Sequence, residues 1–221
     1  MKPLIIFLSG ILLFVSCSKD KDNQPLYAEA RYTVTITGKW SAPAFTVPGG
    51  AHYTTFAGMI HNSNASLWKE GTMASHGTEF MAETGNVSGL LNEVDSMIAD
   101  RSAVSLLLFY GPTVTGSRAT NFSCSNNYPL VSFGAMLGPT PDWFVGVSNI
   151  SLYNNGWVSD TTINLYALDA GTEEGNVFAY NNPPTVPLQN IHILQATEAT
   201  VLANGNPVLA PIATARFRKQ D

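Results

Sequence analysis

The chain has 221 residues, of which 45% are hydrophobic, enough to build the core of one domain of about 200 residues. Charged residues make up only 12%, well below the roughly 25% of average proteins, so the surface is expected to be polar through Ser, Thr, Asn and Gly. The formal net charge of −5 comes without any basic run, which argues against nucleic acid as a partner.

The first 16 residues have the layout of a secretory signal peptide. Lys2 precedes an apolar stretch that is too short for a membrane-spanning helix, which needs about 20 residues. Phe14-Val15-Ser16-Cys17 resembles a bacterial lipobox, in which Cys17 becomes the lipidated N-terminus, and a polar segment follows at once. We therefore expect a signal peptide at 1–16, a tether at 17–29 and a lipid anchor that places the protein on the outer membrane of the cell envelope, periplasmic or surface-facing. The alternative is an ordinary cleaved signal with an incidental cysteine.

The body of the chain begins with β-type patterns. Residues 31–37 alternate polar and apolar side chains, many of them β-branched, which predicts a half-buried strand. Residues 54–60 form a second predicted strand, after a turn at 48–50. Residues 61–75 then read as a polar loop rich in Asn and Ser.

Two helices are predicted next, at residues 75–84 and 87–100, with Ser88 as a candidate cap of the second. The second helix has five apolar residues at helical spacing on one face: Leu90, Leu91, Val94, Met97 and Ile98. The helical pair is expected to cover an edge or an end of a sheet.

The rest of the chain is β-type and contains Cys124, which we expect to be a small buried side chain. Six further strands are predicted, at residues 104–110, 130–137, 143–153, 162–168, 176–180 and 211–218. Short strands separated by turns, without strand–helix alternation, predict an all-β fold. We expect an antiparallel β-sandwich of about eight strands with one or two short covering helices, spanning residues 30–221.

Acidic residues occur in two turns beside predicted strands. Asp142 precedes the strand at 143 and is held in place by Pro139 and Pro141 before it, while Asp169 ends the strand that begins near 162. Glu173 follows four residues later, across a short turn that contains Gly171. If the two turns meet at one rim of the sandwich, the three carboxylates and nearby carbonyls supply the oxygen ligands that Ca²⁺ prefers. Acids in turns are, however, commonly just solvated turn residues.

Other metal motifs are missing from the sequence. The acids do not have the spacing of an EF-hand loop, whose ligands alternate within twelve residues. The four histidines form no paired-ligand motif for zinc: His52, His61, His76 and His192.

Three segments also share an order and spacing with a known family. They are His61-Asn62-Ser63-Asn64 with Leu67-Trp68 and residues 71–75, then Gly138-Pro139-Thr140-Pro141-Asp142-Trp143-Phe144-Val145-Gly146, and then Asp169-Ala170-Gly171-Thr172-Glu173-Glu174-Gly175. With Gly156-Trp157-Val158 and Pro211-Ile212-Ala213, they resemble the spondin N-terminal domain of F-spondin and mindin over about residues 30–218. The resemblance implies a sandwich related to C2 domains, with a cation held by Asp142, Asp169 and Glu173.

The chain departs from that family in two ways. The family usually has Asp where this chain has Glu173, which keeps the charge and changes the reach of the ligand. Animal members carry cysteines near the strand after Pro-Asp-Trp, and residues 152–157 contain none, so that disulfide is absent. The matrix, integrin and microbial-glycan partners of animal members are not carried over.

These observations favour a Ca²⁺-binding, spondin-like adhesion or binding module, displayed by its lipid anchor and recognising an unidentified extracellular protein or glycan. A loop patch of Trp68, His61, Asn62 and Asn64 is a candidate recognition surface, although such a Trp more often plugs the end of a sandwich. The alternative is an envelope hydrolase that uses His61 or His76, but no Gly-x-Ser-x-Gly, His-Glu-x-x-His or Cys–His motif supports an enzyme. A mere structural spacer is a third reading.

Overall fold

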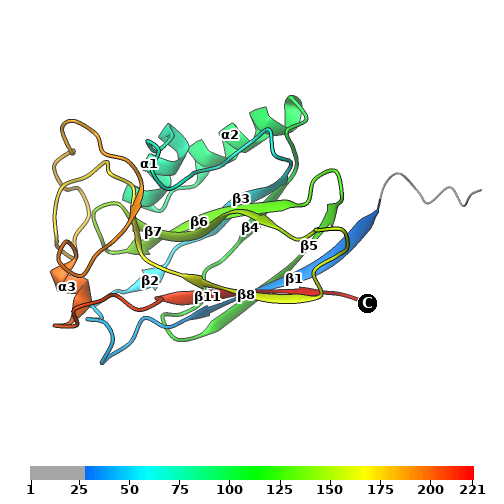
Figure 1. Cartoon of the computed structure of the whole chain (residues 1–221). Helices are drawn as coiled ribbons and strands as arrows, with labels where there is room; N and C mark the ends of the chain where they lie inside the picture. Colours follow the sequence, from blue (N-terminus) through cyan, green and yellow to red (C-terminus); the bar gives the residue numbers. More distant parts are fainter. Residues whose placement is uncertain (1–27) are drawn as a thin grey trace, which may run out of the picture.

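A computed structural model describes residues 28–221, so the predicted signal peptide, Cys17 and most of the predicted tether lie outside the described residues. The described chain forms two antiparallel sheets stacked face to face, with two helices lying over the outer face of the larger sheet (Figure 1). The predicted all-β antiparallel sandwich is therefore confirmed.

The smaller sheet has four strands in the order β5–β1–β11–β8. Their bounds are β1 Glu29–Gly38, β5 Ser117–Ser125, β8 Asp160–Leu165 and β11 Ala213–Lys219. In β1, Tyr32, Val34 and Ile36 are fully buried while the residues between them face outward, which is the alternation predicted from the sequence.

The larger sheet has seven strands in the order β10–β9–β7–β6–β3–β4, with β2 also paired to β6. Their bounds are β2 His52–Tyr53, β3 Phe56–His61, β4 Ala103–Phe109, β6 Leu130–Gly138, β7 Trp143–Ser151, β9 Leu168–Asp169 and β10 His192–Ile193. Side chains from its inner face meet those of the smaller sheet in the main core, where Phe56, Phe133 and Phe217 are fully buried.

The two predicted helices are α1 (His76–Thr84) and α2 (Ser88–Ala99). From the sequence we expected them to cover an edge or an end of a sheet, but they lie over the face of the larger sheet. α1 lies over β6 and β7, and α2 lies over β3 and β4, where they bury a second apolar cluster that includes Met81, Leu90 and Phe144. A third helix, α3 (Thr200–Ala203), is a single turn. None of the helices in residues 28–221 is long and apolar enough to cross a membrane.

Several strand assignments differ from the sequence prediction, and two of them concern segments of five residues or more. The strand predicted at 176–180 is absent, because the side chain of Asn176 bonds to Thr200 and to the Val201 backbone instead of a neighbouring strand. β5 was not predicted, although it pairs with β1 along its whole length. Cys124 in β5 is buried as expected, and burial raises the pKa of its thiol to about 12.

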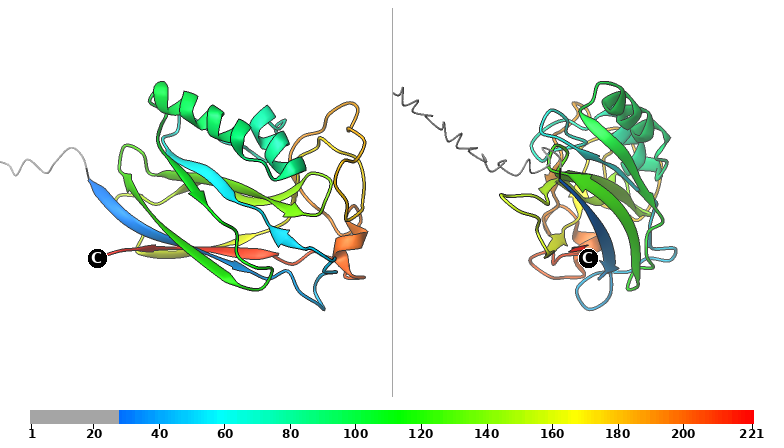
Figure 2. Two further views of the ribbon diagram at one scale, coloured as in Figure 1. Left: turned by 180° about the vertical axis from the view of Figure 1, so that it is seen from behind. Right: turned by 90° about the vertical axis from the view of Figure 1, so that its right-hand side faces the viewer.

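The sandwich has two different ends. The described chain enters at residue 28 and leaves at its C-terminus at one end, while α3 and the long connection between β9 and β11 gather at the opposite end (Figures 1 and 2). The turns that carry Asp142 and Asp169 belong to this opposite end, which we call the rim.

Candidate metal centre

The structure brings together the two turns in which the sequence placed acidic residues. β7 and β9 pair so that Trp143 lies opposite Asp169, and the backbone N–H of Ala170 donates to the backbone oxygen of Asp142 over 3.2 Å. Two bends about 30 residues apart in the chain are thus joined at the rim by direct backbone pairing.

Asp142 is the most buried acid of the site, with no exposed surface. Its Oδ2 atom accepts hydrogen bonds from the Thr172 N–H at 2.7 Å, the Thr172 hydroxyl at 3.2 Å and the Glu173 N–H at 3.1 Å. Its other oxygen, Oδ1, is buried and has no hydrogen-bond partner among the described residues. Burying a carboxylate oxygen without a hydrogen-bond partner costs free energy, so we expect this atom to bind a proton, a water molecule or a cation.

Asp169 and Glu173 lie on the turn that holds Asp142. The Gly171 N–H donates to Asp169 Oδ1 over 2.7 Å, and Asn182 donates to Glu173 Oε2 over 3.4 Å. Gly171 has a φ of 75°, and a Cβ at this position would lie 2.3 Å from the Gln189 carbonyl, so only glycine fits. The turn is therefore fixed in shape, and both Asp169 and Glu173 are half-buried in it.

Burial raises the pKa values of all three carboxyl groups, and repulsion by neighbouring carboxylates adds to it for Asp169 and Glu173. For Asp169 burial and then the charge of Asp142 raise the pKa to about 6, despite the opposing Gly171 N–H. For Asp142 burial raises the pKa against the N–H donors of Thr172 and Glu173. For Glu173 burial again comes first, and the charges of Glu83 and Asp142 add to it. Without a cation, each of these groups is thus harder to ionise than it is in water.

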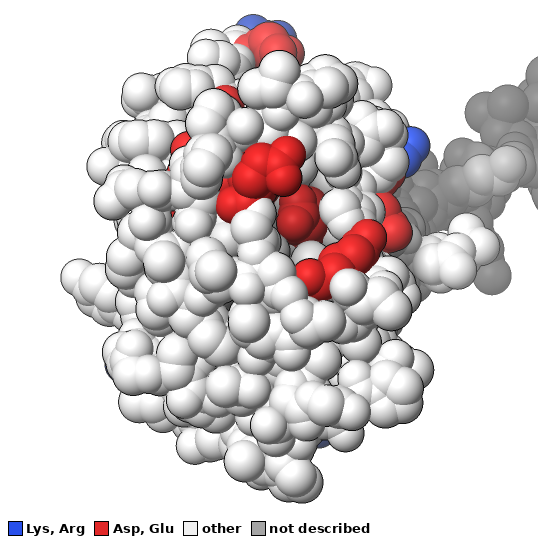
Figure 3. All heavy atoms as spheres, turned by 90° about the vertical axis from the view of Figure 1, so that its left-hand side faces the viewer, with Lys and Arg blue, Asp and Glu red and all other residues white. Residues whose placement is uncertain are grey.

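Glu83, near the end of α1, is a fourth acid that the sequence analysis missed. Burial raises its pKa, as do the charges of Glu79 and Asp142, while the Thr172 hydroxyl lowers it. Glu83 reaches this site only because α1 packs onto β6 and β7, and no local sequence pattern encodes that packing. Figure 3 shows acidic side chains gathered around a hollow in the rim, with Lys and Arg visible only at the margin of this face.

The donor set fits a hard cation, but it is incomplete on protein side chains alone. Carboxylate oxygens such as Asp142 Oδ1 are the ligands that Ca²⁺ prefers, whereas Zn²⁺ favours nitrogen and sulfur. No three His, Cys, Asp or Glu side chains within residues 28–221 stand close enough to form a ready-made metal cluster. A bound Ca²⁺ would therefore need backbone carbonyls or water to complete its six to eight ligands. Metal binding by Asp142, Asp169 and Glu173 stays a prediction.

The predicted recognition patch does not form, because His61 is fully buried. Its two ring nitrogens contact the Asn62 carbonyl and the Ser132 hydroxyl, both at 2.8 Å. The Trp68 indole N–H donates to the Phe133 carbonyl, and its ring packs edge-on against Phe144. Trp68 thus packs on the outer face of the larger sheet and does not plug the end of the sandwich, the commoner role expected from the sequence. Asn62 and Asn64 bond to each other in the loop.

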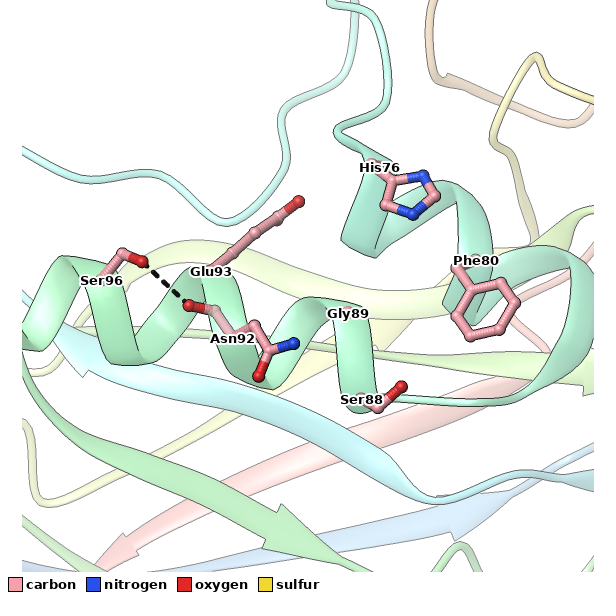
Figure 4. Close-up of a pocket in the computed structure, with 7 residues that line it drawn as sticks. All are labelled: His76, Phe80, Ser88, Gly89, Asn92, Glu93 and Ser96. Atoms are coloured by element: carbon pink, nitrogen blue, oxygen red, sulfur yellow. Dashed lines mark hydrogen bonds between the residues drawn. The ribbon is translucent and has the colours of Figure 1, made fainter.

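His76, the other histidine considered for a hydrolase, lies on a shallow cavity of about 440 Å³ between α1 and α2 (Figure 4). The cavity has one acid in its wall, Glu93, whose two oxygens accept from the Ser75 hydroxyl and the Gly77 N–H, both at 2.7 Å. Glu93 therefore caps α1, and His76 itself stacks on Phe80 at the surface. Neither side chain is arranged as a nucleophile–base pair.

Comparison with known proteins decides the family of this chain. The family model Spondin_N matches residues 30–204. The chain belongs to the Spondin_N family. The match contains all four rim acids, Glu83, Asp142, Asp169 and Glu173.

Relatives of this Spondin_N domain include Spondin-2 and Spondin-1. Rat Spondin-2 is 32% identical over 79% of this chain and 56% of its own length, and human Spondin-2 is 31% identical over 80% and 56%. Chicken Spondin-1 is 32% identical over 76% of this chain and 22% of its own length. The chain thus spans about half the length of Spondin-2 and about a fifth of Spondin-1, and the similarity concerns the Spondin_N part of this chain.

Proposed function

We propose that this Spondin_N domain is a Ca²⁺-stabilised binding module, displayed on the cell envelope by a lipid at Cys17, and not an enzyme. The observation that carries the proposal is the Oδ1 atom of Asp142, which is buried, accepts no hydrogen bond and lies near the carboxylates whose pKa values the Asp142 charge raises. Asp142, Asp169 and Glu173 would hold the cation, with Glu83 close enough to add its charge.

In this role the metal orders a surface and supplies no chemistry. Asp142 fastens the turn 169–173 to the start of β7 through the N–H groups of Thr172 and Glu173. A cation on its free oxygen would offset both the burial and the Asp142 charge that together raise the pKa of Asp169 to about 6. Because it binds only the folded chain, Ca²⁺ would stabilise the rim loops and the whole domain together.

The position of the rim suits display. The described chain begins at the end of the sandwich opposite the rim (Figure 1), so an anchor on Cys17 would leave the rim facing away from the membrane. An unidentified extracellular protein or glycan is the partner class that such a surface would meet. For the alternative hydrolase, His61 has both ring nitrogens engaged in a buried network and cannot reach a substrate.

Thermal unfolding with saturating Ca²⁺ or with EGTA tests the metal. At a Ca²⁺ concentration 100 times the dissociation constant the gain is about 2.7 kcal/mol, and each kcal/mol shifts the Tm of a domain this size by about 2–4 °C. We expect Ca²⁺ to raise the Tm of the wild type by about 5–10 °C, and to have no effect on the isosteric variants Asp142→Asn and Asp169→Asn.

A matched control is Asp95→Asn, which removes an exposed acid of α2. It should respond to Ca²⁺ as the wild type does. Equal Tm values with Ca²⁺ and with EGTA in the wild type would remove the metal from the proposal.

A further inference from the structure

β4 is an edge strand whose exposed side chains are apolar. It pairs with β3 and has no second strand partner among the described residues. Leu107 and Phe109 point into the main core, so the alternate residues face the side covered by helices. Four of these are exposed: Val104 by 45%, Leu106 by 40%, Leu108 by 50% and Tyr110 by 75%.

The other three edges of the sandwich have the features that protect natural sheets from unwanted pairing. β5 carries exposed Arg118 among polar residues, β8 carries Asp160, and β10 has only two residues. β4 has seven residues, and no charged residue occurs from 102 to 117. An unprotected edge beside three protected ones points to a strand that is used for pairing.

The apolar surface continues from β4 onto α2, which runs along this side of the sheet (Figure 2). Glu93 of α2 bonds to the start of α1, so it marks the side of α2 that faces α1. Half-buried Leu91 and Ile98 lie on the opposite side of α2, toward β4. Strand and helix together therefore present one apolar surface at this edge.

We propose that β4 pairs with β4 of a second copy of this chain, antiparallel and across a two-fold axis, joining two seven-stranded sheets. Two-fold pairing requires one residue to lie opposite itself, so that paired side chains share a face. With Leu107 at the axis, Leu106 meets Leu108 of the other copy and Val104 meets Tyr110. In the two neighbouring registers, with Leu106 or Leu108 at the axis, at least one of the four exposed apolar residues lies opposite a residue outside this set. Because β4 has no charged residue, a second copy of β4 also adds no charged side chain to this apolar contact.

Sedimentation velocity of the full chain, in a mild nonionic detergent, tests the dimer. We expect the wild type to sediment as a dimer and Leu106→Lys/Leu108→Lys as a folded monomer, because four lysines then face one another. The charge-swap variant Leu106→Lys/Leu108→Glu places opposite charges across the axis and should restore the dimer. Ala119→Lys, on the exposed face of edge strand β5, should leave the dimer unchanged.

Disulfide cross-linking in the cells that produce the chain tests the register without detergent. In Val104→Cys/Tyr110→Cys the two new thiols lie about 20 Å apart within one chain. In the proposed dimer, however, the thiol at position 104 of one copy lies opposite the thiol at position 110 of the other. Oxidation should give a covalent dimer, and neither Val104→Cys alone nor the wild type, with its own Cys17 and Cys124, should give one.

Three outcomes would overturn the proposal. The first is that the wild type stays monomeric and the double-cysteine variant gives no cross-link. β4 would then bind something else: the N-terminal residues of its own chain, a foreign extended peptide or a lipid surface. The second is a dimer that survives Leu106→Lys/Leu108→Lys. The third is a charge-swap variant that is as monomeric as the double-lysine variant, which would exclude the register centred on Leu107.

Discussion

His61 is buried at the end of β3, and its hydrogen bonds fix its protonation state. The Asn62 carbonyl can only accept, so Nδ1 carries the proton. The Ser132 hydroxyl accepts the Asn149 N–H and donates its own proton to Nε2. A second proton on the ring would remove that acceptor, and burial, the larger effect, also lowers the pKa of His61 below 6.5.

His61 should therefore make the domain less stable in mild acid. Below pH 6.5 the unfolded chain binds a proton that the folded ring resists, so the free energy of unfolding falls as pH drops from 6.5 toward the lowered pKa, by at most about 1.4 kcal/mol per unit. In His61→Gln, whose side-chain oxygen can still accept from Ser132, this contribution disappears. Urea unfolding of both proteins between pH 7.5 and 5 measures the difference, and parallel curves would contradict the assignment.

Some of the candidate functional residues could be predicted from the sequence and others could not. Asp142, Asp169 and Glu173 were found because prolines, a glycine turn and the strand ends around them are encoded locally, and the family resemblance pointed to the same positions. Glu83 was missed because its place depends on how α1 docks. The burial of His61, a candidate for the recognition patch, could not be predicted, because a histidine beside Asn and Ser in a polar segment does not reveal that its ring turns inward onto Ser132.

At the scale of elements, α1 and α2 touch through glycine. A Cβ on Gly77 would lie 2.6 Å from the Leu90 Cα and 2.7 Å from the Leu90 nitrogen, both backbone atoms that cannot turn away. The Gly77 N–H also donates to Glu93 of α2. Close approach of the two helix backbones therefore sets how α1 lies over β6 and β7, and with it the position of Glu83.

Gly77→Ala should destabilise the domain even though alanine favours helix. The added methyl group forces the helices apart, at a cost of about 1–3 kcal/mol that outweighs the gain in helix propensity of about 1 kcal/mol at most. Thermal unfolding measures the loss as a lower Tm. Gly49→Ala is the control, because a Cβ there meets no atom within 4 Å and the Tm should stay near that of the wild type. A Gly77→Ala Tm equal to the control would contradict this packing account.

Elements with strong periodicity were predicted well, and those with weak periodicity were not. The alternation of β1 and the apolar face of α2 gave both elements to within two residues. β5 was missed because its outer face is polar and only its last residues are buried, as suits an edge strand. Residues 176–180 contain Val177 and Tyr180, which favour a strand locally, but the tertiary bonds of Asn176 to the α3 turn hold the segment as a loop.

At the scale of the whole molecule, the fold separates its surfaces. The chain enters at one end, the acidic rim lies at the other, and the apolar edge β4 runs along one side (Figures 1 and 2). Rim and edge are therefore distinct surfaces, so a substitution in one can be tested without altering the other. The sandwich class followed from strand number and spacing, while the face covered by the helices and the free edge were decided by long-range packing.

The most direct test of the central claim is a calorimetric titration of Ca²⁺ into the full chain after removal of bound metal with EGTA. One saturable site in the wild type and in Asp95→Asn, lost in Asp142→Asn, is the result that the structure predicts, because Asp142 Oδ1 is the one carboxylate oxygen within residues 28–221 that is buried without a hydrogen-bond partner. Heats that do not saturate in the wild type, or the same binding in Asp142→Asn, would contradict it.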